Sequence, residues 1–516
     1  MLPVRTNRVV VVGAGIAGLT SALALAAKGL DVTLLERAEQ PGGKMRQIGI
    51  GSSQIDSGPT VFTMRWVFEE LFAQAGESFS DYVKLRPLDV LARHAWSESE
   101  RLDLFASEER STDAIGRFSG SDEARRYRAF CAATRRIYQI LEKPFLRSAS
   151  PSMGTLIGGN GMRGLVDLRQ IRPFTTMWTA LGQYFQDPRL RQMFGRYATY
   201  CGSSPFEAPA TLMLIAHVER EGVWTIDGGI HKLATAIAKC AAKHGAKIRY
   251  GEEVKNVLTS NGAVSGVELT TGERPPADAV IMNADVAAVG SGLFGSGIAH
   301  AAQATPVRSR SLSAMTWSIV AKTEGFPLSR HSVFFSSNYR AEFDDLFRRN
   351  TMPADPTVYV CAQDRCDDGA AADAGTSAER LLVLVNAPPT GDRHVFDAAE
   401  VERCARRAFG ALERCGLRID RLPERVQVTT PNDFNRMFPA TGGALYGRSS
   451  HGWTASFKRP GARTKIAGLY LAGGSTHPGP GVPMAALSGR AAASSLLEDM
   501  KSKTRGWMPA GRSRAV

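Results

Sequence analysis

A strand, a glycine-rich turn and a helix follow one another near the start of the chain. Residues 9–12 read VVVV, glycines stand at positions 13, 15 and 18, and small or apolar residues continue to about Lys28. This order is typical of a dinucleotide-binding unit, in which Gly13 permits the tight turn, Gly15 lets the backbone approach a pyrophosphate, and Gly18 lets the helix pack on the strand. Unpaired N–H groups at the start of a helix also favour a phosphate. The sequence therefore predicts an α/β fold with a dinucleotide site formed by Gly13, Ala14, Gly15, Ile16, Ala17 and Gly18.

The second strand ends in an acid and is followed by more glycine. Residues 31–36 read DVTLLE, which places Glu36 where a carboxylate can bond ribose hydroxyls. The next residues, EQPGGKMR, offer a second close backbone approach together with a cation for phosphate. An NAD-binding chain usually continues into another strand and helix at this point, so the extra glycines favour FAD. We therefore predict FAD as the cofactor and add to its site Glu36, Arg37, Gly43, Lys44 and Met45.

A second glycine-rich turn lies close to the other end of the chain. Residues 468–474 read GLYLAGG, a buried strand stopped by two glycines, and the following PGPGVPMAALSG becomes a helix. This helix start suits the flavin ring or the ribityl-phosphate side of the same cofactor. We therefore expect the two ends of the chain to meet around one long cofactor, with Gly473, Gly474, Val482 and Met484 on its C-terminal side.

Length and composition bound the class of protein. The 516 residues exceed one ordinary core, and 43% hydrophobic and 22% charged residues are typical of globular domains. No run of 18 apolar residues and no signal segment occurs, so we predict neither a transmembrane helix nor secretion. Seven cysteines without CxxC pairs indicate reduced thiols in the cytoplasm. The nine histidines lack metal-ligand spacing, so no metal is predicted.

The net charge of +13 favours binding to a membrane surface over binding to nucleic acid. Arginine is spread through the chain, with neither a zinc finger nor a basic-region heptad, so no nucleic-acid partner is expected. Attraction to an anionic membrane surface is favoured, with a generally arginine-rich surface as the other interpretation. We expect a cytoplasmic protein peripherally associated with the inner or photosynthetic membrane.

The order of patterns along the chain predicts a discontinuous cofactor domain. Helical spacing dominates between the first cofactor segment and a second GG turn at residues 228–229, and strands dominate later, around a loop at 367–378. The FAD-binding domain is expected to comprise residues 1–85, 225–299 and 426–500. The substrate domain is expected to comprise a mostly helical insertion at 86–224 and a sheet-rich segment at 300–425. A basic tail at 501–516 is expected to be disordered.

Several motifs together resemble one family. Residues 468–488 are similar to the carotenoid-desaturase signature, with Pro480 standing where a small or β-branched residue is usual. Four further segments strengthen the likeness: LARHAW at 91–96, FGRYATYCG at 194–202, VYVCAQDR at 358–365 and ASFKRP at 455–460. The chain most closely resembles the 1-hydroxycarotenoid 3,4-desaturases, or methoxyneurosporene dehydrogenases, within the phytoene desaturase and amine oxidase superfamily.

The resemblance implies a fold, a cofactor and a reaction. It implies an FAD-binding Rossmann-like domain of the amine oxidase type with an inserted α+β substrate domain, and it places Val254 at the adenine. It implies desaturation at C3–C4 of an acyclic 1-hydroxy- or 1-methoxy-carotenoid, with the electron acceptor, oxygen or a quinone, left open. Because such a substrate is oily, we expect docking on a membrane, with residues 174–185 and Trp178 bordering the tunnel mouth.

Four polar residues are candidates for direct roles near this substrate. Asp56 and His477 are candidate proton acceptors, although Asp56 can instead brace the turn and His477 can bond the flavin or pack. Arg93 and His94 are candidates for the oxygenated end of the substrate, with a structural pair as the alternative. Hydride loss beside a polyene leaves a cation that conjugation stabilises, so a strong base is unnecessary.

Other functions on the same architecture remain open at this point. Within the flavin enzymes the alternatives are a phytoene desaturase, a carotenoid isomerase that uses reduced flavin, and an amine oxidase. Outside catalysis, escort proteins and GTPase dissociation inhibitors share the architecture but lack an intact flavin turn. The presence of Gly13, Gly15, Gly18 and Glu36 favours the enzymes.

Overall fold

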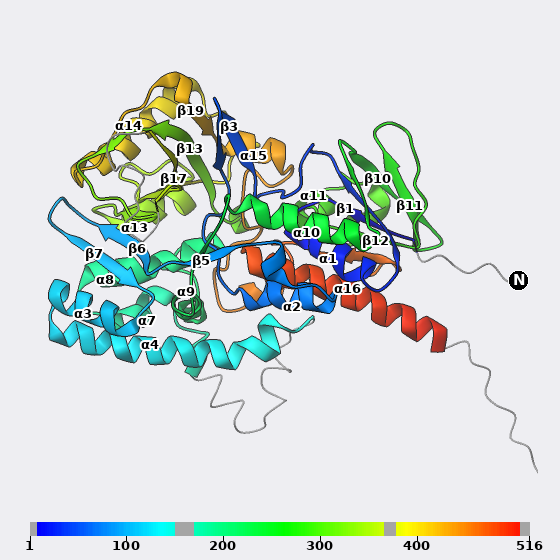
Figure 1. The fold of residues 1–516 in the computed structure, drawn as a ribbon, viewed down its shortest axis with the longest axis horizontal. Coiled ribbons are helices and arrows are strands. Elements are labelled where there is room, and N and C mark those ends of the chain that lie inside the picture. Colours follow the sequence, from blue (N-terminus) through cyan, green and yellow to red (C-terminus); the bar gives the residue numbers. More distant parts are fainter. Residues whose placement is uncertain (1–7, 150–169, 366–377, 506–516) are drawn as a thin grey trace, which may run out of the picture.

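A computed structural model describes residues 8–149, 170–365 and 378–505 of the chain. Figure 1 shows three parts: a sheet with helices α1, α10 and α16 on one side, a second sheet with α14, and a group of helices that includes α3, α4 and α7. The first part carries both glycine-rich turns, and the other two are inserted into it along the chain.

The first part is built on a five-stranded parallel sheet. Its strand order is β20-β12-β1-β2-β9, with every neighbouring pair parallel. The strands are β1 (Arg8–Val12), β2 (Asp31–Glu36), β9 (Lys247–Tyr250), β12 (Ala279–Met282) and β20 (Leu469–Leu471). Parallel strands present their carboxyl ends at one edge of a sheet. Segments more than 400 residues apart in the sequence therefore deliver their turns to the same place.

Strand β1 is apolar throughout because both faces of the sheet are buried at this strand. Val9 and Val11 pack into the core formed with the helices, whereas Val10 and Val12 pack into a core on the opposite face. A strand buried on both faces is a continuous hydrophobic run. The helices are α1 (Ile16–Ala26), α2 (Trp66–Gln74), α10 (His231–Lys243) and α16 (Val482–Arg505). The opposite face is covered by β10 (Val254–Ser260), β11 (Ala263–Leu269), α11 (Val286–Gly290) and α12 (Ser296–Ala299).

The second sheet has seven strands in the order β19-β13-β17-β16-β15-β6-β7. Its neighbouring pairs are antiparallel except for β15 and β6, which are parallel. The strands are β6 (Val90–Ala95), β7 (Arg101–Phe105), β13 (Ser313–Ala321), β15 (His331–Phe334), β16 (Val358–Ala362), β17 (Glu379–Ala387) and β19 (Val426–Thr429). Helix α14 (Ala398–Arg414) packs on one face. The mostly helical insertion thus also supplies two strands of this sheet.

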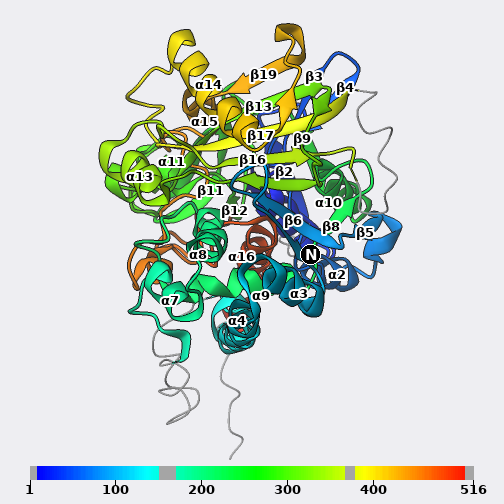
Figure 2. The same ribbon diagram turned by 90° about the vertical axis from the view of Figure 1, so that its left-hand side faces the viewer.

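The remaining helices form a layer beneath the second sheet in Figure 2. They are α3 (Glu108–Ser119), α4 (Ser121–Leu141), α7 (Met177–Tyr184), α8 (Pro188–Gly195) and α9 (Leu214–Arg220). Short elements complete the fold: β3 (Gln47–Ile50), β4 (Ser53–Asp56), β5 (Leu85–Pro87), β8 (Trp224–Ile226), β14 (Thr323–Glu324), α13 (Tyr339–Asp344), β18 (Arg418–Ile419) and α15 (Pro431–Met437).

Three sequence expectations concern the ends, the loop and the surface. Helix α16 runs to Arg505, so the expectation of a disordered tail is corrected for residues 501–505; residues 490–505 contain no glycine or proline that would end the helix earlier. Residues 506–516 and nearly all of the loop at 367–378 lie outside the described residues.

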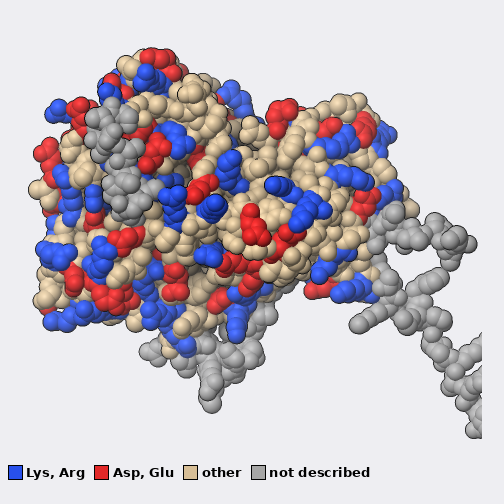
Figure 3. All heavy atoms as spheres, in the orientation of Figure 1, with Lys and Arg blue, Asp and Glu red and all other residues tan. Residues whose placement is uncertain are grey.

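Lys and Arg are interspersed with Asp and Glu on the face drawn in Figure 3. No helix in the described part of the chain is long and apolar enough to cross a membrane.

A buried acid in α13 makes stability depend on pH. Glu342 is 2% exposed and accepts hydrogen bonds from Ser336 Oγ at 2.9 Å and from Thr357 Oγ1 at 2.7 Å. Burial raises its pKa from an ordinary 4.5 to about 7, against the opposing effect of these hydrogen bonds. Between these two pH values the folded protein binds more protons than the unfolded chain.

The free energy of unfolding is therefore expected to fall as pH rises from 4.5 to 7 and to stay level above pH 7, as far as Glu342 is concerned. The loss is up to about 3 kcal/mol. A Glu342→Gln variant removes this contribution, so urea denaturation should show it gaining on the wild type between pH 5 and pH 8. Parallel stability profiles for the two proteins would contradict the assignment.

Candidate cofactor and substrate site

One large cavity connects both glycine-rich turns with the helical layer. Its volume is about 1220 Å³. At one end it is lined by the carboxyl edge of the five-stranded sheet, including Val12, Glu36 and Gly473. At the other end apolar side chains of the helical layer line it, including Leu141 and Ile215. A polar, glycine-rich compartment therefore opens into an apolar one.

The first turn has the features of a phosphate site. Helix α1 begins at Ile16 after Gly15, and no side chain caps its first N–H groups. Gly13 has a φ of +100°, and a Cβ on Gly15 would lie 2.7 Å from Asn283 Oδ1. Gly15 also forms a parallel bridge with Gly42, which brings the two glycine loops side by side. Uncapped N–H groups at a helix start, held in a glycine cradle, fit a pyrophosphate.

The acid at the end of β2 is held by backbone groups. Glu36 is 9% exposed, and its oxygens accept hydrogen bonds from Ala14 N at 2.6 Å and Ala38 N at 2.9 Å. A carboxylate has further lone pairs, so Glu36 can still accept from a hydroxyl in the cavity. The adjacent Arg37 donates to the Met437 carbonyl and ties the end of β2 to the end of α15.

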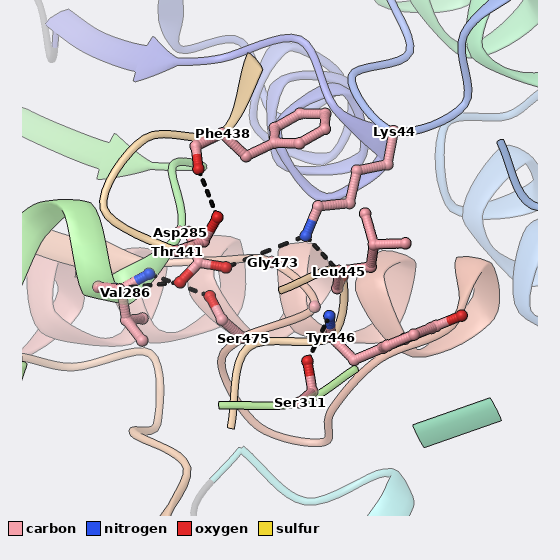
Figure 4. Close-up of polar contacts among 12 residues, drawn as sticks. Lys44, Asp285, Val286, Ser311, Phe438, Thr441, Leu445, Tyr446, Gly473 and Ser475 are labelled. Carbon is pink, nitrogen blue, oxygen red and sulfur yellow. Dashed lines mark hydrogen bonds and ion pairs between the residues drawn. The ribbon is translucent and has the colours of Figure 1, made fainter. Parts of the chain in front are cut away.

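Lys44 points toward Asp285 and Leu445, close to the C-terminal glycine turn at Gly473, as Figure 4 shows. Its Nζ donates to the Leu445 carbonyl at 2.6 Å and lies 3.9 Å from Asp285 Oδ2. It also lies 5.1 Å from the centre of the Phe438 ring. Burial lowers the pKa of Lys44 below its ordinary value, and the opposing effect of Asp285 offsets this only in part. The ammonium group is thus held at the cavity wall with unused donor capacity for a phosphate oxygen.

The C-terminal turn forms the facing wall. Gly473 has a φ of +143°, a conformation that a side chain disfavours. Its N–H donates to Ser488 Oγ at 3.2 Å, which fixes the turn on α16. Most of the predicted cofactor residues line the cavity: Gly13, Gly15, Ile16, Ala17, Glu36, Arg37, Gly43, Lys44, Met45, Val254, Gly473, Gly474, Val482 and Met484. Ala14 and Gly18 lie behind this wall and support it.

Residues 16–497 match the family model described as flavin containing amine oxidoreductase. The chain belongs to this family. It is an FAD-dependent oxidoreductase with the expected α/β FAD-binding fold. The cradle of glycines, the uncapped helix start and Lys44 fit the pyrophosphate of FAD, and Glu36 fits its ribose.

Similar proteins indicate which group of flavin containing amine oxidoreductases this chain resembles. The hydroxyneurosporene desaturase of Rubrivivax gelatinosus is 54% identical over 504 residues, which cover 98% of this chain and 95% of that protein. The hydroxyneurosporene desaturase of Cereibacter sphaeroides is 42% identical, covering 96% of this chain and 99% of that one. An oxidoreductase structure from Methanosarcina mazei covers 95% of this chain and 100% of its own, with a TM-score of 0.61 at 17% identity. The resemblance to carotenoid desaturases is confirmed.

Asp56 braces the fold of this FAD enzyme and does not line the cavity. Its carboxylate accepts from Ile230 N at 2.8 Å and from Gln47 Nε2 at 3.0 Å. A Cβ on Gly229 would lie 2.2 Å from Asp56 Oδ2, which explains the glycine there. We therefore correct the catalytic interpretation of Asp56 to the alternative, a brace at the start of α10.

His477 likewise contacts a residue of the cavity wall and not the cavity itself. Its Nε2 lies 2.9 Å from the Phe145 carbonyl, and its ring packs edge-on against Phe145 at 4.8 Å. Burial lowers its pKa to about 4, so the imidazole is neutral at pH 7. Phe145 lines the cavity whereas His477 does not. His477 therefore positions an apolar wall residue, and the interpretation of it as a proton acceptor is corrected.

The expected substrate contacts of two further segments also need correction. Arg93 forms two hydrogen bonds of 2.7 Å with Asp103, and His94 is buried against Phe335, so they form structural contacts outside the cavity wall. Trp178 packs on Phe206 at 4.7 Å rather than on the cavity. Nearby, Pro173 and Trp453 do line the cavity.

Sequence reasoning missed several polar residues of the cavity wall. They lie mostly in the mid-chain segments that carried the family resemblance, and that resemblance was the available signal. The residues are Arg196 and Tyr200 from 194–202, Tyr359 from 358–365 and Arg459 from 455–460. No group of three or more His, Cys, Asp or Glu residues in the described ranges could hold a metal ion.

Proposed function

We propose that this protein is a carotenoid desaturase that removes two hydrogens across the C3–C4 bond of an acyclic carotenoid bearing a hydroxyl or methoxyl group at C1. The continuity of the cavity carries the proposal, because one space joins the FAD residues to a long apolar compartment. The activity named for the relatives at 54% and 42% identity supports the same reaction.

The apolar compartment suits a hydrocarbon chain. Its wall comes from the end of α4, the following short helix at Glu142–Leu146, the segment at Ile171, and α9 together with the residues that lead into it. Side chains that line it include Leu141, Phe145, Ile171, Leu212, Ile215 and Val218. Such a wall binds by excluding water, which also protects a cationic polyene from attack.

The reaction divides between the cofactor and the protein. FAD, when bound, supplies the two-electron acceptor that no side chain can provide. The protein orients the C3–C4 bond and excludes water, and the second hydrogen leaves as a proton. Because Asp56 and His477 do not line the cavity, we assign no side chain as a strong base, in keeping with a substrate cation that conjugation stabilises.

The direct test uses the purified yellow protein and liposomes that contain 1-hydroxyneurosporene. The expected result is a product lighter by two hydrogens, with its absorption shifted to longer wavelength. An isomerase would require a reductant and leave the mass unchanged. An escort protein would bind the carotenoid without converting it, and either result would reject the proposal.

Substrate solubility supports delivery from a bilayer. Carrying a forty-carbon chain through water would cost about 30 kcal/mol at ~0.8 kcal/mol per carbon group. Phe174 is 68% exposed and Trp453 is 42% exposed, with their rings 5.0 Å apart. Trp453 lines the cavity, so this aromatic pair marks its mouth and replaces Trp178 in that role.

Replacing both Phe174 and Trp453 by glutamate is expected to weaken binding to anionic vesicles by about 100-fold, since each buried aromatic contributes about 1.5 kcal/mol or more. Vesicle flotation measures the loss. Val395, which is 76% exposed, provides the control because Val395→Glu changes an exposed apolar residue outside the cavity wall. Equal flotation of the double variant and the wild type would exclude this docking site.

A further inference from the structure

Four polar residues form a hydrogen-bonded group in the cavity wall, which we call the Arg196 cluster: Arg196, Tyr197, Tyr200 and Glu219. Both phenols donate to Glu219, Tyr197 to Oε2 and Tyr200 to Oε1, each at 2.6 Å. Arg196 Nη1 donates to the Tyr200 oxygen at 3.1 Å. Arg196, Tyr200 and Glu219 line the cavity. This group is unexpected in a compartment built for hydrocarbon.

Arg196 has hydrogen-bonding capacity to spare. The residue is 8% exposed, and its Nε is buried without a partner. Within the described ranges, no carboxylate lies within 4.0 Å of its guanidinium, and both oxygens of Glu219 accept from the phenols instead. Burial opposes its charge, but Tyr200 and Glu219 raise the pKa of Arg196 above its ordinary value, so it stays cationic. A buried cation with unused donors favours any ligand that brings an oxygen acceptor.

A second polar group lies next to the Arg196 cluster and borders the FAD loops. Tyr359 shares hydrogen bonds with Thr60 Oγ1 at 2.6 Å and with His331 Nδ1 at 2.7 Å. Thr60 and Tyr359 line the cavity, and burial, followed by the charges of Arg330 and Arg196, lowers the pKa of His331 to about 3. Thr60 comes two residues after Gly58. A Cβ on Gly58 would lie 1.9 Å from the Lys44 carbonyl oxygen, so the loops that carry Thr60 and Lys44 are in close contact. The polar wall therefore continues from Arg196 to the loop that carries Lys44.

The position of this wall matches the chemistry of the proposed substrate. In a carotenoid with oxygen on C1, the reacting bond begins two carbons away, so the oxygen lies only about 3–4 Å from it. The oxygen must therefore enter the cofactor end of the cavity together with the C3–C4 bond. A pure hydrocarbon end would leave the Arg196 cation buried there without an acceptor.

We propose that Arg196 donates a hydrogen bond to the C1 oxygen of the substrate and is the residue that selects oxygenated carotenoid ends over hydrocarbon ends. This inference rests on the proposed desaturase function. Both a hydroxyl and a methoxyl oxygen accept from a guanidinium, so Arg196 serves either substrate. A hydroxyl can in addition donate to the oxygen of Thr60 or Tyr359, which a methoxyl cannot.

The test compares two substrates that differ only at C1: 1-hydroxyneurosporene and 1,2-dihydroneurosporene, which carries hydrogen in place of the hydroxyl. The wild type is expected to prefer the hydroxylated substrate in kcat/KM and in equilibrium binding, measured anaerobically by the shift of carotenoid absorbance. In Arg196→Met the preference is expected to fall by about 10- to 100-fold, as for loss of one hydrogen bond to a charged donor. FAD content, from the flavin absorbance, is measured alongside.

The control is Arg191→Met on α8, the helix that ends at Gly195, directly before Arg196. Arg191 stacks on Trp178 and donates to its carbonyl but does not line the cavity, so its removal should leave the preference unchanged. If Arg196→Met does not fold, Tyr200→Phe decides, because it removes the phenol oxygen to which Arg196 Nη1 donates while keeping the ring. A rise in the preference of about 3- to 10-fold supports the inference, and an unchanged preference contradicts it.

Two results would overturn the proposal in distinguishable ways. A wild-type preference that persists unchanged in the folded variants would show that another group reads the C1 oxygen, while desaturation itself stands. Binding without conversion of either substrate by the wild type would remove the desaturase function on which the inference rests.

Discussion

Gly18→Ala is expected to abolish FAD binding and to destabilise the protein by about 3 kcal/mol or more. A Cβ at this position would lie 2.0 Å from the Gly13 carbonyl oxygen and 3.0 Å from Asn283 Oδ1. Gly13 and helix α1 both belong to the rigid unit that forms the pyrophosphate cradle, so moving either one costs free energy. Helix α1 must then move away from β1, and its N–H groups leave the cofactor. Flavin absorbance per protein and thermal unfolding measure the two effects.

Gly410→Ala is the matched control for this substitution. Gly410 also lies within a helix, α14, but a Cβ there meets nothing within 4 Å. Alanine has the higher helix propensity, so this variant should be more stable than the wild type by about 0.5–1 kcal/mol and retain full FAD content. A Gly18→Ala protein that stays yellow and as stable as the wild type would refute the close packing of α1 on the turn.

Arg459→Met is expected to cost about 3–5 kcal/mol of stability and to weaken FAD binding at least about 10-fold. Arg459 is 7% exposed, and its Nη1 donates to the carbonyls of Tyr446 at 3.0 Å and Gly474 at 3.1 Å. Its Nη2 donates to the Arg448 carbonyl at 2.5 Å. The side chain thus joins the loop at 446–448 to the C-terminal glycine turn, and its loss leaves three partly buried carbonyl acceptors without their donor.

Arg463→Met, four residues away, separates this effect from loss of charge alone. Arg463 is 40% exposed and pairs with Glu498 and Asp499 at the surface, where an ion pair contributes about 1 kcal/mol or less. Denaturation with urea and retention of FAD on ultrafiltration measure both variants. If Arg459→Met lost no more stability or FAD than Arg463→Met, the clamp would have no energetic role.

The cofactor end of the site could be predicted because its determinants are local. The strand at 9–12, the glycines at 13, 15 and 18 and the acid at 36 lie within one short unit, where spacing alone fixes the turn and the helix start. The second glycine turn followed from the same pattern at the other end of the chain. Placing both turns at one edge required only the rule that parallel strands point the same way.

The roles of individual polar side chains could not be predicted in this way. Asp56 looked available for proton transfer, but the backbone N–H groups at the start of α10 lie against it. Trp178 had the spacing of a tunnel residue, but Phe206 and Tyr339 cover it. Burial by a distant segment decides such cases, and a local pattern contains no information about it.

The sequence by itself determined the cofactor class and the family, because these depend on short motifs with a fixed geometry. Only the tertiary structure decided that Thr60 meets Tyr359, 299 residues away, and that Arg196 lies in the wall of an oily cavity. These contacts depend on strand register and on how the inserted segments pack over the cofactor sheet. A shift of one residue in either would point different side chains at the substrate.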